Sequence, residues 1–296
     1  MNALVFPGQG SQFVGMGKDL YENHEDAKKM FLQANKILDF DITDVMFNGT
    51  VEDLKKTDIT QPAIFIHSCI TYFINNVKDI SAFAGHSLGE FSAVTCSGSL
   101  SFEEGLELVL IRARAMQNAC KNNDSTMAAI LALSDEIIDE ECKKINNVVP
   151  ANYNCPGQIV ISGSNEGIEK ACAIFKDKGG KAIPLPVGGG FHSPYMESAR
   201  IELEDAVNQA NISTPSAPIY QNYDAKGYSK PENIRNNLIS QLTSPVRWTQ
   251  SVNNMINDNV KVFIERGPGR PHSIKTFTLS LIMLLTDCVH LTGEVN

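Results

Sequence analysis

Ser87 stands in a sequence that could make its hydroxyl a nucleophile. Gly85-His-Ser87-Leu-Gly89 matches G-x-S-x-G, the sharp turn in which a strand passes into a helix and exposes a serine hydroxyl. An apolar run, Ser81 to Ala84, precedes the motif, and the helix-favouring segment Leu88 to Val94 follows it. This context favours a nucleophile elbow over an ordinary glycine turn.

His192 is the histidine best placed to act as a base. A serine hydroxyl needs a base to take its proton, and histidine is the usual one. His192 lies in Gly188-Gly-Gly-Phe191-His192-Ser-Pro194, where three glycines and a proline indicate an irregular loop, and catalytic groups commonly lie on such loops. His86 adjoins Ser87, but neighbours on a strained turn normally point apart. From these residues alone, a histidine that only satisfies loop carbonyls is an equally good interpretation of His192.

Arg112 is the candidate for binding an anion. Leu108 and Met116 stand four residues before and after it, which places Arg112 on the apolar side of a predicted helix. A buried guanidinium needs an anion, and its planar fork fits a carboxylate. That carboxylate could belong to a substrate or to an Asp or Glu of the protein, and the residues alone leave both open.

The loop from Phe6 to Gln12 resembles a phosphate-binding loop but fails on spacing. Phe13 stands where the dinucleotide fingerprint needs its third glycine, and Gly17-Lys18 lacks the earlier glycine of a P-loop. The N–H groups of such a loop still suit an oxyanion, with a plain tight turn as the alternative. The sequence has no H-E-x-x-H and no clustered Cys and His, so we expect no metal site.

Composition limits the class of protein that positions these residues. The 296 residues are 43% apolar and 20% charged, as in one large or two modest globular domains. The net charge of −9 argues against nucleic acid as a main partner. The longest apolar stretch, Phe277 to Leu285, is too short to cross a bilayer, and we expect no signal peptide and no membrane partner. Seven cysteines without a C-x-x-C pair predict reduced thiols and a cytoplasmic location.

The order of elements predicts an α/β protein. Apolar strands at Ala3 to Phe6 and Ser81 to Ala84 alternate with helices, one of them opened by a capping box at Ser101 to Glu104, which favours a parallel sheet. Further along, the pattern becomes strand, helix, strand, strand, helix, strand, the order of ferredoxin-like domains. These six segments are Met127 to Leu133, Ser134 to Lys144, Val148 to Ala151, Gln158 to Ser162, Asn165 to Lys178 and Lys181 to Val187.

We therefore predict two domains. A large α/β-hydrolase-like domain with a parallel sheet would comprise residues 1–119 and 198–296. A small ferredoxin-like (βαββαβ) domain would be inserted at residues 120–197. In the second part of the large domain, a helical pattern resumes near Ile201, and after Ile219-Tyr220 another spans Pro231 to Leu242.

Taken together, these motifs resemble the malonyl-CoA:acyl carrier protein transacylase family of fatty acid synthesis, which is related to the acyltransferase domains of polyketide synthases. The landmarks follow the family order from about residue 3 to residue 270. They are Phe6 to Gln12, Thr60 to Ala63, Gly85 to Glu90, Arg112 with Met116-Gln117, Asn154 to Gln158, Phe191 to Pro194, Gln241 with Ser244 to Trp248, and Gly267 to Gly269.

The resemblance implies a role for each matching residue in catalysis. Ser87 would be the acylated nucleophile and His192 its base. The main-chain carbonyl of Gln241 would orient the imidazole in place of a triad's carboxylate. The backbone N–H groups of Leu88 and Gln12 would form the oxyanion hole.

The resemblance also implies the substrate and the partner. Arg112 would bind the free carboxylate of the malonyl group, and Gln61, Met116 and Phe191 would line its pocket, with Phe191 favouring malonyl over methylmalonyl. The reaction would carry malonyl from malonyl-CoA to the phosphopantetheine thiol of acyl carrier protein through a malonyl-serine, in fatty acid or polyketide synthesis. We expect no cofactor, since coenzyme A arrives as part of the substrate and phosphopantetheine belongs to the partner. We also expect a monomer.

Two other functions stay open, and the chain departs from the family in three places. A serine acyl hydrolase or thioesterase could use the same dyad, and a non-catalytic subunit that docks carrier proteins is a third possibility. Ala113 stands where the family has glycine after its arginine, and Gly188 to Gly190 is unusually rich in glycine. After Gly269 the sequence lacks the family's amphipathic terminal helix.

Overall fold

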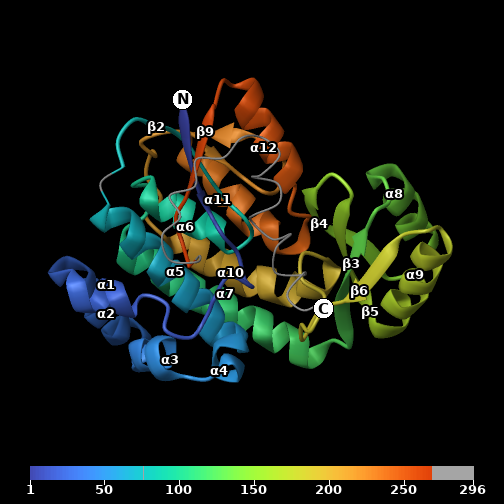
Figure 1. The fold of residues 1–296 in the computed structure, drawn as a ribbon, viewed down its shortest axis with the longest axis horizontal. Helices are drawn as coiled ribbons and strands as arrows, with labels where there is room; N and C mark the ends of the chain where they lie inside the picture. Colours follow the sequence, from blue (N-terminus) through green and yellow to red (C-terminus); the bar gives the residue numbers. More distant parts are fainter. Residues whose placement is uncertain (76, 269–296) are drawn as a thin grey trace.

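The computed structural model describes residues 1–75 and 77–268. Its strands form two sheets, and Figure 1 shows the smaller sheet beside a larger, mainly helical body that contains the other sheet. The predicted departure after Gly269 and the apolar stretch Phe277 to Leu285 lie outside the described residues. Every candidate site residue named above lies within them.

The large sheet has five strands in the order β8-β7-β2-β1-β9. These are β1 (Asn2–Phe6), β2 (Ile80–Gly85), β7 (Ile219–Tyr220), β8 (Gly227–Tyr228) and β9 (Val262–Glu265). β1 pairs parallel with β2 and β9, and β2 pairs parallel with β7, which confirms the predicted parallel sheet for these four strands. β8 is antiparallel to β7, because the segment 221–226 that joins them is too short for the crossover that a parallel pair needs.

Helices cover both faces of this sheet, and further helices pack outside them. In chain order they are α1 (Lys18–Asn23), α2 (Glu25–Leu38), α3 (Ile42–Asn48), α4 (Val51–Lys55), α5 (Thr57–Ile74), α6 (Gly89–Cys96), α7 (Phe102–Asn122), α10 (Glu197–Gln209), α11 (Pro231–Ser240) and α12 (Trp248–Asn257), with short 3-10 turns η1 (Pro194–Met196) and η2 (Gln241–Thr243). Successive residues of a strand point to opposite faces, so Leu4 belongs to the main core and Val5 to a second core beneath Trp248 of α12. Both faces of the sheet are therefore buried against apolar side chains.

Two helix ends bear on the site. The Ser101 hydroxyl accepts a hydrogen bond from the N–H of Glu104 at 3.1 Å, and α7 begins at the next residue, as the capping motif predicted. The helix predicted over Pro231 to Leu242 is shorter: α11 ends at Ser240, and Gln241 opens the tighter turn η2. Within this turn the carbonyl of Gln241 accepts the N–H of Ser244 at 3.3 Å.

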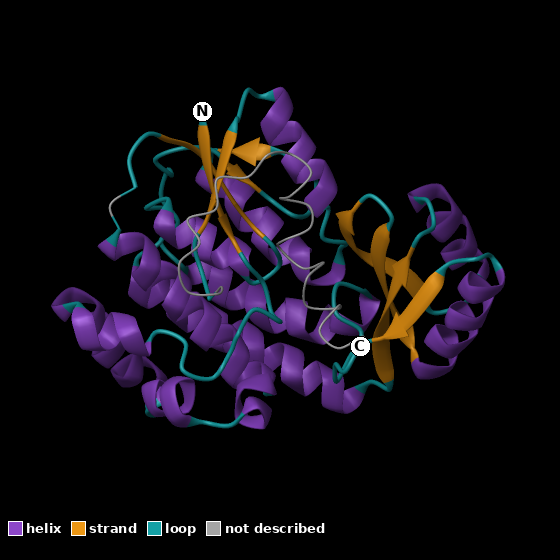
Figure 2. Ribbon diagram, viewed as in Figure 1, coloured by secondary structure: helices purple, strands orange, loops and turns teal. Residues whose placement is uncertain are grey.

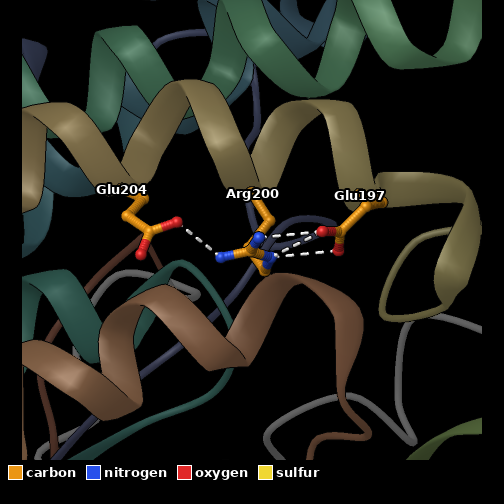
Figure 3. Close-up of polar contacts among 3 residues, drawn as sticks. All are labelled: Glu197, Arg200 and Glu204. Carbon is orange, nitrogen blue, oxygen red and sulfur yellow. Dashed lines mark hydrogen bonds and ion pairs between the residues drawn. The ribbon is translucent and has the colours of Figure 1, made fainter.

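Surface charges reinforce α10, which packs against α7. Figure 3 shows Arg200 between Glu197 and Glu204, and its Nη2 and Nη1 atoms lie 2.8 Å and 2.7 Å from their carboxylate oxygens. Nε of Arg200 also donates to the Glu197 carboxylate, so that two nitrogens of the guanidinium bind the same carboxylate. Partly exposed pairs of this kind contribute about 0.3–0.5 kcal/mol each. Their effect is modest support for one helix rather than a determinant of the fold.

The small sheet has the predicted order of elements. It contains β3 (Ser125–Leu131), α8 (Asp135–Lys144), β4 (Val148–Cys155), β5 (Gln158–Ser164), α9 (Asn165–Asp177) and β6 (Lys181–Pro184). Its strand order is β4-β5-β3-β6 with every neighbouring pair antiparallel, and Figure 2 shows its helices gathered on one side. The last strand is shorter than predicted, because Pro184 and Pro186 lack the N–H that a longer ladder would need.

The small sheet is joined to the large body along β4. The N–H of Val246 donates to the carbonyl of Ala151 at 2.8 Å, and the N–H of Tyr153 donates to the carbonyl of Val246 at 2.9 Å. Ile130 and Ile161 pack under the small sheet's own helices, whereas Met127 and Val160 face the large body. The outer face of the small sheet thus has its own core, and its inner face lies toward the large body.

Candidate active site

Ser87 lies at the turn between β2 and α6, with the backbone that the motif predicts. Its φ is +50°, a left-handed conformation that is uncommon for a residue other than glycine. A Cβ on Gly85 would lie 1.9 Å from the carbonyl carbon of Gly89, and a Cβ on Gly89 would lie 2.2 Å from the carbonyl oxygen of Phe6. Glycine is required at both positions because backbone from the neighbouring strand and helix fills the space.

His192 lies against Ser87, and Gln241 lies behind it. Nε2 of His192 is 2.7 Å from Oγ of Ser87, and Nδ1 is 3.0 Å from the main-chain carbonyl oxygen of Gln241. Because a carbonyl can only accept, Nδ1 carries the proton and Nε2 is free to accept one from the serine. Burial, assisted by the nearby Arg112 charge, lowers the pKa of His192 to about 3, so the imidazole is neutral at physiological pH.

The loop that carries His192 is held by the small sheet. Ser125 of β3 accepts the N–H of Gly190 at 2.9 Å, and Ser162 of β5 donates to the carbonyl of Phe191 at 2.5 Å. A Cβ on Gly189 would lie 2.3 Å from the sulfur of Cys120, so one of the three consecutive glycines is needed for close packing on α7. His192 itself has a φ of +54°. Close packing therefore accounts for the glycine at position 189, while position 188 has space for a side chain.

Arg112 reaches the same serine from α7. Its Nη2 donates to Oγ of Ser87 at 3.0 Å and to Oε1 of Gln241 at 3.1 Å, and its Nη1 donates to Oε1 of Gln61 at 2.6 Å. All three acceptors are uncharged, although the side chain is only 1% exposed. Burial lowers the pKa of Arg112 to about 10, and the buried Glu90 opposes that shift through space. The guanidinium stays a cation at neutral pH and is held in place by neutral oxygens.

A pocket of about 570 Å³ lies between the small sheet and the large body and reaches Ser87, His192 and Arg112. Seven of the nine predicted site residues line it: Gln12, Ser87, Leu88, Arg112, Met116, Phe191 and His192. Gln61 and Gln241 are not in its lining, and they meet it through their hydrogen bonds to Arg112. Met127 and Val160 of the small sheet and Val51 of α4 add apolar walls. The pocket can hold an extended chain whose end meets Ser87.

Leu88 and Gln12 lie where two backbone N–H groups could meet an oxyanion. Both residues line the pocket, and Leu88 caps the start of α6. Among residues 1–75 and 77–268, neither N–H donates a hydrogen bond to another protein group. The Gln12 side chain folds back to accept the N–H of Gly10 at 2.8 Å, which fixes this loop. The free N–H of Leu88 at the N-terminus of α6 and that of Gln12 in its loop are suited to stabilise negative charge.

Some residues around the serine were missing from the sequence prediction. The side chain of Asn222 is hydrogen-bonded to both Ser87 and Gly85, and Glu90 is buried next to it. Gln241 was predicted only for its carbonyl, yet its Nε2 also donates to the carbonyl of Ser87 at 3.0 Å. Glu90 belongs to the motif at 85–90 and could have been considered, whereas a single Asn after a two-residue strand carries no signal. His86 points away from Ser87, with its Nε2 3.0 Å from Oδ1 of Asn154 in β4.

The described residues contain neither a metal-binding cluster nor a helix that could cross a membrane. No cluster of three or more His, Cys, Asp or Glu within 1–75 and 77–268 is arranged to hold a metal ion. In the same part of the chain, none of the helices has the length and apolarity needed to span a membrane.

Comparisons with known proteins agree on one family. A family model described as the acyl transferase domain matches residues 3–277. The malonyl CoA-acyl carrier protein transacylase of Bacillus subtilis strain 168 is 40% identical over 275 residues, covering 90% of this chain and 87% of that protein. The enzyme of the same name from Haemophilus influenzae is 39% identical over 276 residues, covering 90% of this chain and 88% of that protein.

Solved structures give the same result for the fold. An acyl carrier protein S-malonyltransferase from Vibrio cholerae superposes with a TM-score of 0.87 at 38% identity, covering 91% of this chain and 90% of that one. A malonyl-transacylase solved in complex with its type II polyketide synthase acyl-carrier protein gives a TM-score of 0.89 at 35% identity, covering 97% and 93%.

Proposed function

The chain belongs to the malonyl-CoA:acyl carrier protein transacylase family, and we propose a role in malonyl transfer for each of its site residues. It is an acyltransferase that moves the malonyl group from malonyl-CoA to acyl carrier protein. One observation supports the assignment of roles above the others. Oγ of Ser87 lies within hydrogen-bond distance of both the neutral His192 imidazole and the Arg112 cation.

In the first half-reaction Ser87 becomes malonylated. Nε2 of His192 takes the hydroxyl proton as Oγ attacks the thioester carbonyl carbon, and the carbonyl oxygen becomes an oxyanion. The N–H groups of Leu88 and Gln12 stabilise that charge. When the carbon–sulfur bond breaks, the coenzyme A sulfur takes the proton from His192. The malonyl group is left on the serine, and the imidazole is neutral again.

In the second half-reaction the carrier protein takes the malonyl group. The phosphopantetheine thiol gives its proton to Nε2 of His192, and its sulfur attacks the acyl-serine carbonyl. The same two N–H groups stabilise the second oxyanion. The carbon–oxygen bond then breaks, Oγ recovers the proton from His192, and malonyl leaves as a thioester of the carrier. The carbonyl of Gln241 keeps the proton on Nδ1 throughout and so keeps Nε2 available.

Arg112 selects the acyl group. Its neutral partners Gln61 and Gln241 fix the guanidinium but leave its charge uncompensated at hydrogen-bond distance. The free carboxylate of a malonyl group supplies the missing anion and at the same time brings the thioester to Ser87. Met116 and Phe191 complete the wall around the acyl group. An ordinary esterase has no use for a buried cation here, which favours the transferase over a serine hydrolase.

Other parts of the sequence prediction stand as proposals. We propose that residues 120–197 form the inserted small domain, supported by a second sheet that runs from Ser125 to Pro184 with its own core. The place of the reaction in fatty acid or polyketide synthesis, the cytoplasmic location and the monomeric state remain predictions.

Acylation of a single serine tests the proposed roles. Intact-mass measurement after mixing with malonyl-CoA should find one malonyl group on the native protein and none on Ser87→Ala. Ser92→Ala is the matched control, because it removes a buried α6 hydroxyl that has no hydrogen-bond partner in the described chain. That variant should be acylated like the native protein. A malonyl adduct on folded Ser87→Ala would show that another residue is the nucleophile.

A further inference from the structure

Asn222 extends the pairing of two strands onto the serine turn. β2 and β7 pair in parallel through Phe83 with Ile219 and Ala84 with Tyr220, and there β7 ends. Two residues further on, the side chain of Asn222 continues the contact. Its Oδ1 accepts the N–H of Ser87 at 2.6 Å, and its Nδ2 donates to the carbonyl of Gly85 at 2.7 Å. One amide thus binds both sides of the turn.

Glu90 holds Asn222 from the helix that follows the turn. Its Oε2 accepts the main-chain N–H of Asn222 at 2.6 Å, and its Oε1 accepts Nε2 of Gln221 at 3.1 Å. Glu90, Asn222 and Gln221 are all completely buried. Glu90 lies in the first turn of α6, where the helix dipole favours an acid, although burial raises its pKa to about 7. The turn, Asn222 and the helix therefore form a closed ring of hydrogen bonds.

This ring determines which N–H groups are free around the nucleophile. The left-handed backbone of Ser87 costs free energy and persists only if its surroundings impose it. Asn222 occupies the N–H of Ser87, so that group is not available to an oxyanion, while the N–H of Leu88 stays free. Asn222 is not among the residues that line the pocket. Its influence on the reaction must pass through Ser87.

We propose that Asn222, supported by Glu90, is a positioning residue that holds the Ser87 turn with Oγ against His192 and the N–H of Leu88 toward the oxyanion. The proposal rests on the proposed role of Ser87 as the nucleophile. Loss of Asn222 should slow acylation by about 10- to 100-fold, the cost of a small misplacement of reacting groups. The apparent KM for malonyl-CoA should change little. Malonyl and acetyl transfer should fall by the same factor, because Arg112 is untouched.

Single-turnover acylation of Asn222→Ala and Asn222→Asp tests this. The aspartate keeps an acceptor for the N–H of Ser87 but places a second oxygen against the carbonyl of Gly85, so its acylation should be slowed at least as much as that of the alanine variant. Leu38→Ala is the control for general destabilisation, because Leu38 is a buried core residue of α2 outside the pocket. Its acylation rate per folded molecule should match the native rate. Thermal unfolding of each variant gives the folded fraction.

The outcomes separate the two proposals. If the native protein is not acylated on Ser87, the proposed nucleophile is wrong. If the native protein is acylated and the Asn222 variants react within about twofold of it, the positioning role is overturned while the proposed function stands. A rise in KM at unchanged maximal rate, or a changed ratio of malonyl to acetyl transfer, would also overturn it. Where Asn222→Ala does not fold, the aspartate variant and Glu90→Gln, which should also slow acylation at unchanged KM, decide the question.

Discussion

Arg112 donates from Nη2 to Oγ of Ser87 across 3.0 Å, so a buried cation and the nucleophile meet at one end of the pocket. Its other hydrogen bonds go to neutral amides, its Cζ lies 5.6 Å from the centre of the Phe91 ring, and its Nε has no hydrogen-bond partner in the described chain. A structural ion pair would have placed a carboxylate of the protein against it. The geometry instead leaves room for the carboxylate of an acyl group whose other end is the thioester.

Arg112→Ala should therefore lose malonyl transfer far more than acetyl transfer. Stranding the malonyl carboxylate without its partner costs about 2–5 kcal/mol, or roughly 30- to 5,000-fold in kcat/KM. Acetyl has no carboxylate, so its transfer should hold steady or rise. The ratio of the two kcat/KM values is the quantity to measure. Arg112→Lys should restore it only in part, because a point charge cannot make two parallel hydrogen bonds. Equal losses for both acyl groups, with lower stability, would mean that Arg112 is structural.

Gly89→Ala should destroy the serine turn. The new Cβ would lie 2.2 Å from the carbonyl oxygen of Phe6, which is strand backbone and cannot move aside. We expect a stability loss of at least about 1–3 kcal/mol and no measurable acylation. Gly188→Ala is the matched control, since its Cβ would meet nothing within 4 Å. Denaturant unfolding and intact mass measure both effects. A Gly89→Ala protein with native stability and native acylation would refute the packing argument.

The acylation rate should stay level as the pH is lowered. Burial lowers the pKa of His192 to about 3, so the base stays neutral in mild acid. An imidazole with an ordinary pKa near 6.5 would lose about tenfold in rate at about pH 5.5. Acylation with malonyl-CoA at about pH 7.5 and about pH 5.5 distinguishes the two cases. A tenfold fall would mean that His192 titrates like an exposed histidine.

The same lowered pKa should make His192 a source of acid instability. Below about pH 6.5 the unfolded chain binds a proton at this histidine that the folded chain does not, so stability falls as the pH falls. At about pH 5.5 the loss is about 1 kcal/mol relative to neutral pH. His192→Gln lacks this loss, and Glu90, whose raised pKa acts in the opposite direction, is common to both proteins. A pH-independent difference in unfolding free energy between the two proteins would contradict the assignment.

The parts of the fold that follow local rules could be predicted from the sequence. The capping motif at Ser101 predicted the start of α7, and the glycines around Ser87 predicted the turn, because few other residues are allowed at these positions. The alternation of elements predicted the order of strands and helices in the small sheet, although β4 is longer and β6 shorter than predicted. The helices between Lys18 and Ile74 received no prediction. α5 is apolar on nearly every side and has no amphipathic pattern, whereas α2 buries residues at helical spacing and could have been predicted.

The parts of the site that depend on distant contacts could not be predicted from residue patterns. Asn222 lies 135 positions from Ser87, and only the pairing of β7 with β2 brings them together. The side chain of Gln241 bridges Arg112 and Ser87, which lie on separate elements. The sequence motif indicated only the role of its main-chain carbonyl. The antiparallel strand β8 received no prediction, although Asn222, Asp224 and Gly227 are residues typical of the turn that precedes it.

The fate of the malonyl group on Ser87 distinguishes transfer to a carrier protein from transfer to water. The malonyl-enzyme should be isolated and then mixed with carrier protein bearing phosphopantetheine, with carrier lacking that group, or with buffer alone, and each sample followed by intact mass. We expect rapid loss of malonyl from the enzyme and its appearance on the phosphopantetheine carrier only. Release of malonate at one common rate in all three mixtures would show instead that the protein is a hydrolase.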